Sequence, residues 1–240
     1  PIINRWAQVS ISGRENVIAT VDTPDTRNHP GARHSSLTWT DKQGKLWLLG
    51  GRNPTELADF WSFDTKTRQW TCVSIGVGQT TPIYGTKGIP SNNNRPGRRS
   101  GAATWTDKNG DLWLFGGSSR DDLWKYVISS RQWTWMKGSN VERQHSVFGT
   151  KTVGDVANTP GVRNLSGFWT DLDGNFWLMG GSGFVRDFVC NRNLSISHNN
   201  LWKLDIGSPP INSVVNNTTR KKDNYLTITD QPAAKPSMRV

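Results

Sequence analysis

The sequence has few of the residues that build metal knuckles, disulfide scaffolds and acid–base catalytic sites. Its 240 residues include two Cys, three Met, four His and only three Glu. Cys72 and Cys190 lie far apart, with no C-x-x-C pair and no His at ligand spacing. The His residues are scattered, and no pair of acids stands out for proton transfer. We therefore expect no catalytic residues, no metal and no cofactor, and the chain is not predicted to be an enzyme.

Long hydrophobic runs are absent as well. No stretch approaches the roughly 18 apolar residues that a membrane-spanning helix needs, so no membrane span is predicted. Hydrophobic residues make up 34% of the chain, and there are 24 Gly and 12 Pro. This composition excludes a disordered or collagen-like chain. The length suits one all-β domain or two smaller domains.

Tryptophan is abundant, and nearly all of it recurs at fixed spacing. Of the 13 Trp, 12 fall on four repeated positions. The first Trp lies in a T-W-T-D segment, which reads F-W-T-D in the third unit; the second follows eight residues later, the third lies beyond a Gly pair, and the fourth closes the unit. In order, these positions are Trp39, Trp105 and Trp169; Trp47, Trp113 and Trp177; Trp61, Trp124 and Trp202; and Trp70, Trp133 and the isolated Trp6. The chain is therefore a repeat protein with a period of 64 to 66 residues.

Each repeat predicts four short antiparallel strands. In the first unit the strands are expected at 35–40, 46–49, 60–64 and 69–73, and the second unit repeats the pattern. The first two strands are joined by a turn with Asp first and Gly fourth, at Asp41–Gly44, Asp107–Gly110 and Asp171–Gly174. Leu112–Phe115 is apolar on both faces, as expected of a strand between two neighbouring sheets. Four-stranded units of this kind are typical of β-propeller blades.

The run L-W-L-L-G-G, then D-F-W-S-F-D, then R-Q-W over 46–70 resembles the kelch repeat, and 112–133 matches it again. The resemblance covers about residues 30 to 206 and implies a kelch-type β-propeller similar to the central domain of galactose oxidase. The units are longer than the usual kelch repeat of about 50 residues. The excess lies in two inserts, 75–95 and 138–160, which share the segments Y-G-T-K and F-G-T-K.

The repeats predict five segments. Residues 1–29 hold the fourth strand of a preceding or last blade, around Trp6, and an inter-blade loop. Blades follow at 30–95, 96–159 and 160–206, the last without its fourth strand, and 207–240 form a polar, basic tail or linker. Three blades make an incomplete propeller, because closed rings typically have four to eight. The chain is thus expected to be part of a longer propeller, or to be completed by a second copy as a homodimer.

Long loops are predicted to collect on one face of the blades, where binding residues on a rigid scaffold are expected. The favoured function is a binding module that engages a protein partner through this face. The alternative is a secreted carbohydrate-binding or carbohydrate-active propeller, either a lectin or a galactose-oxidase-like enzyme, for which exposed aromatic side chains in the loops would argue. The candidate binding residues are Arg52, Tyr84, Lys87, Arg120, Phe148, Lys151, Phe184 and Arg186.

Arg33, Arg99 and Arg163 recur just before each first strand. The kelch resemblance implies that this strand is the innermost one, so the three guanidinium groups are candidates for a ring around a central channel that would bind an anion. Pairing with acids or backbone within each blade is the alternative. The net charge of +10 is dispersed, so nucleic acid is not a predicted partner. Four glycosylation sequons favour secretion, but the compartment stays open between secreted and cytoplasmic.

Overall fold

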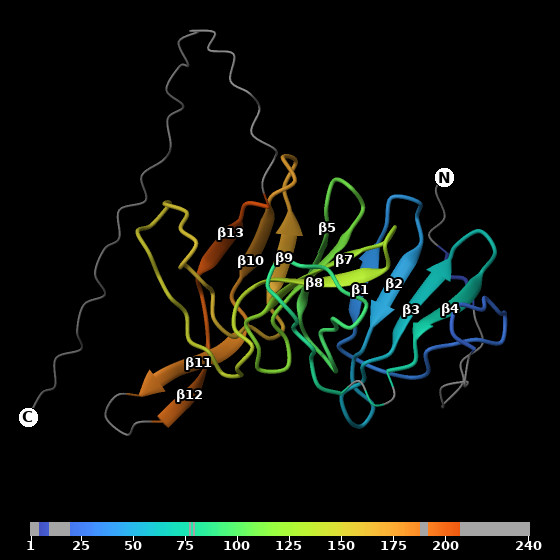
Figure 1. The fold of residues 1–240 in the computed structure, drawn as a ribbon, viewed down its shortest axis with the longest axis horizontal. Helices are drawn as coiled ribbons and strands as arrows, with labels where there is room; N and C mark the ends of the chain where they lie inside the picture. The colour runs from blue at the N-terminus through green and yellow to red at the C-terminus, as the bar shows by residue number, and fades with distance from the viewer. Residues whose placement is uncertain (1–4, 10–19, 77, 79, 188–191, 207–240) are drawn as a thin grey trace, which may run out of the picture. The chain divides into compact units, whose positions relative to one another are not determined.

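The computed structural model describes residues 5–9, 20–76, 78, 80–187 and 192–206 (Figure 1). All regular secondary structure in these residues is β-strand. The strands form successive antiparallel sheets along the chain, which Figure 1 shows side by side from blue to orange. The all-β prediction is therefore confirmed.

The first two sheets are four-stranded meanders, each with strands in chain order. The first consists of β1 (Leu37–Thr40), β2 (Leu46–Leu49), β3 (Phe60–Asp64) and β4 (Gln69–Ser74). The second consists of β5 (Ala103–Thr106), β6 (Leu112–Phe115), β7 (Leu123–Val127) and β8 (Gln132–Lys137). Their registers repeat, since Trp39 pairs with Trp47 and Trp105 with Trp113. Both have a register shift at the start of the third strand.

The third sheet has three strands, in the order β13-β10-β9. These are β9 (Gly167–Thr170), β10 (Phe176–Met179) and β13 (Leu201–Leu204). The long loop that was expected between β10 and β13 instead contains a hairpin, in which β11 (Ser182–Asp187) pairs with β12 (Arg192–Ser197). We call the three sheets blades 1, 2 and 3.

The predicted turns between the first and second strands are present. In blade 1 the N–H of Gly44 donates to the carbonyl of Asp41 at 3.0 Å. The Asp41 side chain also accepts from the N–H of Gln43 at 2.9 Å and from Trp47 Nε1 at 2.8 Å. Asp107 and Asp171 repeat these roles in their blades. The repeated Asp thus fixes both the turn and the Trp of the second strand.

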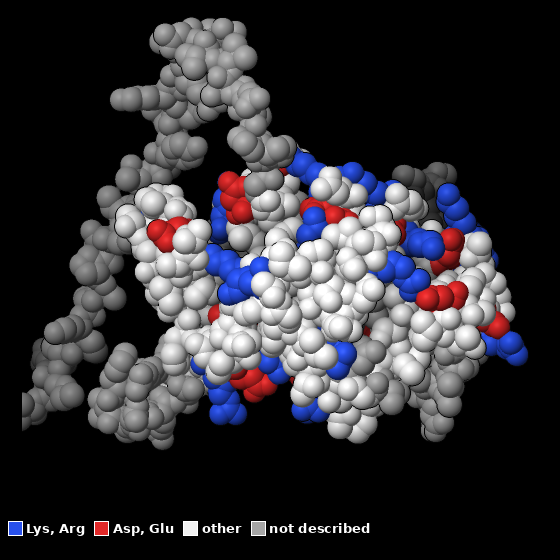
Figure 2. All heavy atoms as spheres, viewed as in Figure 1, with Lys and Arg blue, Asp and Glu red and all other residues white. Residues whose placement is uncertain are grey.

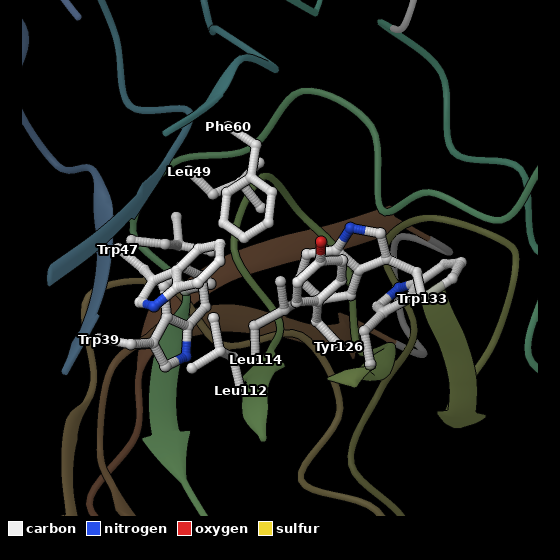
Figure 3. Packing of buried hydrophobic residues seen from close by; sticks show 11 residues of the cluster. Trp39, Trp47, Leu49, Phe60, Leu112, Leu114, Tyr126 and Trp133 are labelled. Carbon is white, nitrogen blue, oxygen red and sulfur yellow. The ribbon is translucent and has the colours of Figure 1, made fainter. Parts of the chain in front are cut away.

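The core lies between the blades. Figure 3 shows Trp39, Trp47 and Phe60 of blade 1 against Leu112, Leu114, Tyr126 and Trp133 of blade 2. The Phe60 ring meets the Tyr126 ring edge-on at 5.0 Å. Blades 2 and 3 share a second core, where the Phe176 ring stacks on Trp105 at 5.1 Å. Strand β6, which lies in the middle blade, is buried along its whole length, and its sequence is accordingly apolar throughout.

The Gly pair after each second strand allows close approach of the next blade. Gly51 donates its N–H to the carbonyl of Arg99, and Gly117 donates to the carbonyl of Arg163, both at 2.9 Å. Both glycines have positive φ angles, and a Cβ added to the neighbouring Gly116 would lie 2.6 Å from the carbonyl oxygen of Arg163. A side chain here would push the blades apart.

The inserts pack against the blade that follows them. Residues 86–94 run along β8, where Ser91 forms a bridge with Trp133 and the N–H of Gly88 donates to the Trp135 carbonyl at 2.8 Å. Residues 22–28 run along β4 in the same way, with a bridge between Asp25 and Trp70. These two segments therefore cover the outer edges of blades 1 and 2.

The strand predicted around Trp6 is not formed in residues 5–9, and Trp6 is fully exposed. A fourth strand forms by hydrogen bonding to a third strand, and no strand in the described part of the chain pairs with this segment. The blade boundaries predicted from the repeat stay a prediction, and the tail 207–240 lies outside the described residues.

Candidate binding face

The three repeated arginines lie inside their blades and do not ring a channel. The Arg33 guanidinium pairs with both Asp59 carboxylate oxygens at 2.8 Å, and its side chain is 4% exposed. Arg99 is fully buried and forms the same bidentate pair with Asp122. Both guanidinium groups are occupied by a carboxylate of their own blade. The prediction of a three-arginine anion site is therefore wrong, and the alternative of pairing with acids holds for blades 1 and 2.

Blade 3 differs, because Asn200 stands where the other blades have Asp. Arg163 Nη2 donates to Asn200 Oδ1 at 3.1 Å and to Ser146 Oγ at 3.2 Å. Arg163 is only 1% exposed, and no carboxylate pairs with it among the described side chains. Burial alone lowers the pKa of its guanidinium to about 10. Among its described side chains, blade 3 thus buries a cation without a counter-ion.

The residue that pairs with each arginine also holds the Trp of the third strand. Trp61 Nε1 donates to Asp59 at 2.7 Å, and Trp124 Nε1 donates to Asp122 at 2.9 Å. In blade 3 Trp202 Nε1 donates to Asn200 at 3.0 Å. The sequence reasoning missed these partners, although each stands two residues before its Trp in every repeat.

Thr and Trp side chains of the first strands, not arginines, line the groove where β1, β5 and β9 meet. This groove has a volume of about 350 Å³ and is lined by Thr38, Trp39, Thr40, Thr104, Trp105, Thr106, Phe168, Trp169 and Thr170. The Thr104 hydroxyl donates to the carbonyl of Thr38 and the Thr106 hydroxyl to that of Thr40, both at 2.9 Å. These hydroxyls bridge neighbouring blades.

Tyr84 and Lys87, two predicted binding residues, pack on blade 2. The Tyr84 ring lies 5.3 Å from the Trp124 ring and 4.8 Å from the Trp135 ring, and its hydroxyl donates to Asp122 at 2.9 Å. Burial, reinforced by the Asp122 charge, raises the pKa of Tyr84 to about 12. Lys87 Nζ lies 4.3 Å from the Trp135 ring centroid. Both side chains therefore attach the insert to the blade.

Arg120 and Arg52 lie in the loops after the second strands. Arg120 donates to Glu142 at 2.7 Å and to the Tyr84 hydroxyl at 3.3 Å, and its side chain is 13% exposed. It joins the loop between β6 and β7 to both inserts. Arg52 is exposed, and its side chain donates locally, to the carbonyl of Pro54 at 3.1 Å.

The candidates in blade 3 are more open. Phe148 is 64% exposed although it stacks on Trp202 at 5.5 Å, and Lys151 is exposed. Phe184 is half-buried in β11, with the Arg143 guanidinium 5.9 Å from its ring. The side chain of Arg186 lies outside the described part of the structure.

The loops predicted to share one face do meet. Glu56, in the loop between β2 and β3, accepts from the Ser118 hydroxyl at 2.7 Å and from the Ser100 hydroxyl at 2.9 Å. The N–H of Arg143 in the second insert donates to the Ser119 carbonyl at 2.9 Å. The loops after the second strands and the inserts therefore form one continuous surface, which we call the long-loop face.

The inserts expose many large apolar side chains. These are Ile75, Ile83, Ile89, Val141, Val147, Phe148, Val153 and Val156. Two pairs are repeat equivalents, Ile83 with Val147 and Ile89 with Val153, so both inserts present the same apolar positions. Exposed apolar side chains that gather on loops of a rigid scaffold are typical of a binding surface.

Charge and metal-ligand geometry complete the description of the surface. Figure 2 shows Lys and Arg side chains interspersed with Asp and Glu over the face in view. Tyr126 is 3% exposed and belongs to the inter-blade core. Within the described ranges, no group of three or more His, Cys, Asp or Glu side chains lies close enough together to coordinate a metal ion. The same ranges contain no helix with the length and hydropathy to cross a bilayer.

Comparison with known proteins identifies the repeat. Residues 42–75, from the first turn of blade 1 to the end of its fourth strand, match the kelch motif. The matched residues lie in a four-stranded antiparallel sheet, and the repeat of that sheet in blade 2 is consistent with a partial kelch-type propeller. A solved structure titled as a novel fungal alcohol oxidase of the AA5 family, in complex with copper, is similar to 72% of this chain at 14% identity, with a TM-score of 0.32. The match covers 55% of the length of that oxidase.

Proposed function

We propose that this chain is a non-enzymatic binding module whose long-loop face engages a protein partner. The proposal is carried by the exposed apolar side chains that both inserts present at equivalent positions, such as Ile83 and Val147. The short-turn face has mainly polar turns built around Asp41, Asp107 and Asp171. Kelch motifs commonly serve protein binding, which fits the match over residues 42–75. An apolar surface with scattered charge suits a protein surface better than a polyanion.

The alternative, a carbohydrate-binding or carbohydrate-active propeller, needs aromatic rings free to stack on sugars. Of the aromatic candidates, Tyr84 is packed between Trp124 and Trp135, and Phe184 is half-buried. Phe148 is exposed but already stacks on Trp202. The favoured ligand is therefore a protein.

A matched pair of substitutions tests the face. Val141 is 59% exposed on an insert, and Leu172 is 105% exposed on a short turn at the other end of blade 3. We expect Val141→Glu to lower capture of the partner from an extract of the native cells about tenfold, as burying a charge in an apolar contact costs more than 1 kcal/mol. Leu172→Glu should leave capture unchanged. Equal capture by both variants would contradict the proposal.

Cross-linking locates the contact independently. A lysine-reactive cross-linker should join the captured partner to Lys151 on an insert, and not to Lys42 or Lys108 on the short turns; all three side chains are exposed. A glycan array is run in parallel. Saturable glycan binding that Phe184→Ala abolishes would replace the protein partner with a sugar.

A further inference from the structure

A pocket lies between blade 1, blade 2 and the segment 92–97, which ends the first insert and begins the next unit. Its volume is about 190 Å³. Strands β2, β3 and β4 of blade 1 contribute residues to one side of it, and Tyr126, Arg131 and Trp133 of blade 2 contribute to another. A cavity of about 150 Å³ can hold benzene, so this pocket has room for a molecule built around one ring.

The inner wall of the pocket is aromatic. Figure 3 shows Phe60 of blade 1 across from Tyr126 and Trp133 of blade 2, and all three residues line the pocket. The Phe60 ring lies 5.0 Å from the Tyr126 ring and 5.7 Å from the Trp133 ring. Because all three side chains are buried in the core that the two blades share, this wall is already formed and suits the apolar part of a ligand.

Arg95 gives the pocket an unpaired cation. Its Nε is buried and has no hydrogen-bond partner among the described residues. Three other arginines also have a buried Nε without a partner, but the terminal nitrogens of each donate to a side-chain oxygen. No carboxylate pairs with Arg95 in the described part of the chain. A buried donor without a partner is unfavourable, so an acceptor that reaches Arg95 is bound strongly.

The other polar groups of the pocket are of the same kind. Arg131 adds a second guanidinium, which pairs with Asp22, and no Asp or Glu is among the lining residues. The Oδ1 atom of Asn92 accepts from the Gln132 side chain at 2.9 Å, so the hydrogen-bonding groups that remain on this carboxamide are N–H donors. A positively charged pocket with N–H donors and an apolar wall suits an organic anion.

The repeat separates the residues that build the segment from the one that charges the pocket. The positions of Asn94, Pro96 and Gly97 hold the same residue types in every unit, at 28, 30 and 31 and again at 158, 160 and 161. The position of Arg95 instead holds His29 in one unit and Thr159 in the other. The segment therefore folds in the same way without an arginine, and Arg95 is specific to this pocket.

We propose that the pocket binds the carboxylate of a small organic acid whose apolar body is about the size of one ring. The carboxylate accepts hydrogen bonds from the Arg95 guanidinium, a geometry in which two parallel bonds can form. The body lies against the wall of Phe60, Tyr126 and Trp133. This inference does not depend on the proposed protein partner, because it concerns the purified chain and a small molecule.

A ligand series tests the chemistry of the pocket. The backbone amides of the isotopically labelled 240-residue chain are followed by nuclear magnetic resonance. Benzoate should cause saturable shifts in residues 92–95 and in β4. Benzamide, which has the same shape but no charge, and inorganic phosphate, which has no apolar body, should each bind about tenfold more weakly or less. Equal affinity for benzamide or phosphate would overturn the proposal. So would tighter binding of N-acetyl-aspartate methylamide, which would assign the pocket to an acidic side chain of another protein.

Matched substitutions test the position of the site. Arg95→Gln should lower the affinity for benzoate about tenfold or more, whereas Arg98→Gln, at an exposed arginine three residues further on, should leave it unchanged. Thermal unfolding of Arg95→Gln should match that of the unmodified chain, because no ion pair is lost. Ala58→Leu adds bulk at a lining residue and keeps Arg95, and it should also weaken binding. Full affinity in Arg95→Gln or in Ala58→Leu would overturn the proposal.

Discussion

Asn200 sets the third blade apart at the scale of single residues. Asp59 and Asp122, its equivalents, each bind an arginine and a third-strand Trp through one carboxylate. Asn200 keeps the bond from Trp202 but offers Arg163 only a neutral oxygen. A buried guanidinium without a carboxylate is unfavourable, as the lowered pKa of Arg163 reflects.

Asn200→Asp is therefore expected to stabilise the protein. The new carboxylate would receive charge-assisted hydrogen bonds from Arg163, which is already buried, and raise the pKa of its guanidinium. Hydrogen bonds to charged groups contribute about 1.5–3 kcal/mol, so we expect a gain of about 1–3 kcal/mol in the free energy of unfolding, measured by urea denaturation. The reciprocal Asp122→Asn should cost about 3–5 kcal/mol, since it breaks a buried ion pair. Unchanged or lower stability of Asn200→Asp would contradict this account.

At the scale of elements, local patterns predicted the strands well and the inserts poorly. The predicted strands at 46–49, 60–64 and 112–115 match β2, β3 and β6 residue for residue, because apolar runs and turn residues delimit them. The β11–β12 hairpin was missed, since it has no counterpart in the other repeats. The packing of each insert on the following blade was also missed, because it depends on contacts such as that of Asn94 with Trp133, 39 residues apart.

The contribution of an insert Asn to the free energy of unfolding is therefore expected to be larger where its carboxamide also bonds a fourth strand. Asn94 is 4% exposed and bonds both Ile89 and Trp133, so Asn94→Ala is expected to cost about 1–3 kcal/mol by leaving the Trp133 carbonyl unsatisfied. Asn158→Ala removes a carboxamide whose one hydrogen bond among the described residues is the local bond to Val153, and it should cost less than about 1 kcal/mol. Chemical denaturation measures both. Equal costs would mean that the carboxamide acts only within its own loop.

At the scale of the whole molecule, the blades contact one another only as neighbours in a row. The core of blades 1 and 2 shares no residue with the core of blades 2 and 3. The repeat spacing predicted this linear arrangement, because each unit is apolar on both faces. The repeat spacing did not predict where the arginine side chains lie. Each blade has one equivalent Arg, and its spacing in the sequence is the same whether the side chain faces a central channel or an Asp within the blade. Stability in such a molecule is expected to be nearly a sum of nearest-neighbour interfaces.

Separate interfaces predict that blade 3 can be released without unfolding blade 1. Phe176 stacks on Trp105 and meets Trp113 edge-on at 5.7 Å, so it joins blades 2 and 3. Phe176→Ala should cost about 3–5 kcal/mol, the usual range for a buried Phe. Hydrogen exchange should then speed up in β9, β10 and β13 while β1 to β4 stay protected.

Phe60→Ala provides the comparison. Phe60 lies between blades 1 and 2 and contacts Trp47 at 5.2 Å and Tyr126 at 5.0 Å, so its loss should leave β9, β10 and β13 protected and expose the amides of blade 1. The opposite patterns of the two variants follow only if each core stabilises its own pair of blades. Uniform loss of protection in both would mean that the three blades unfold as one cooperative unit, and the nearest-neighbour description would have to be abandoned.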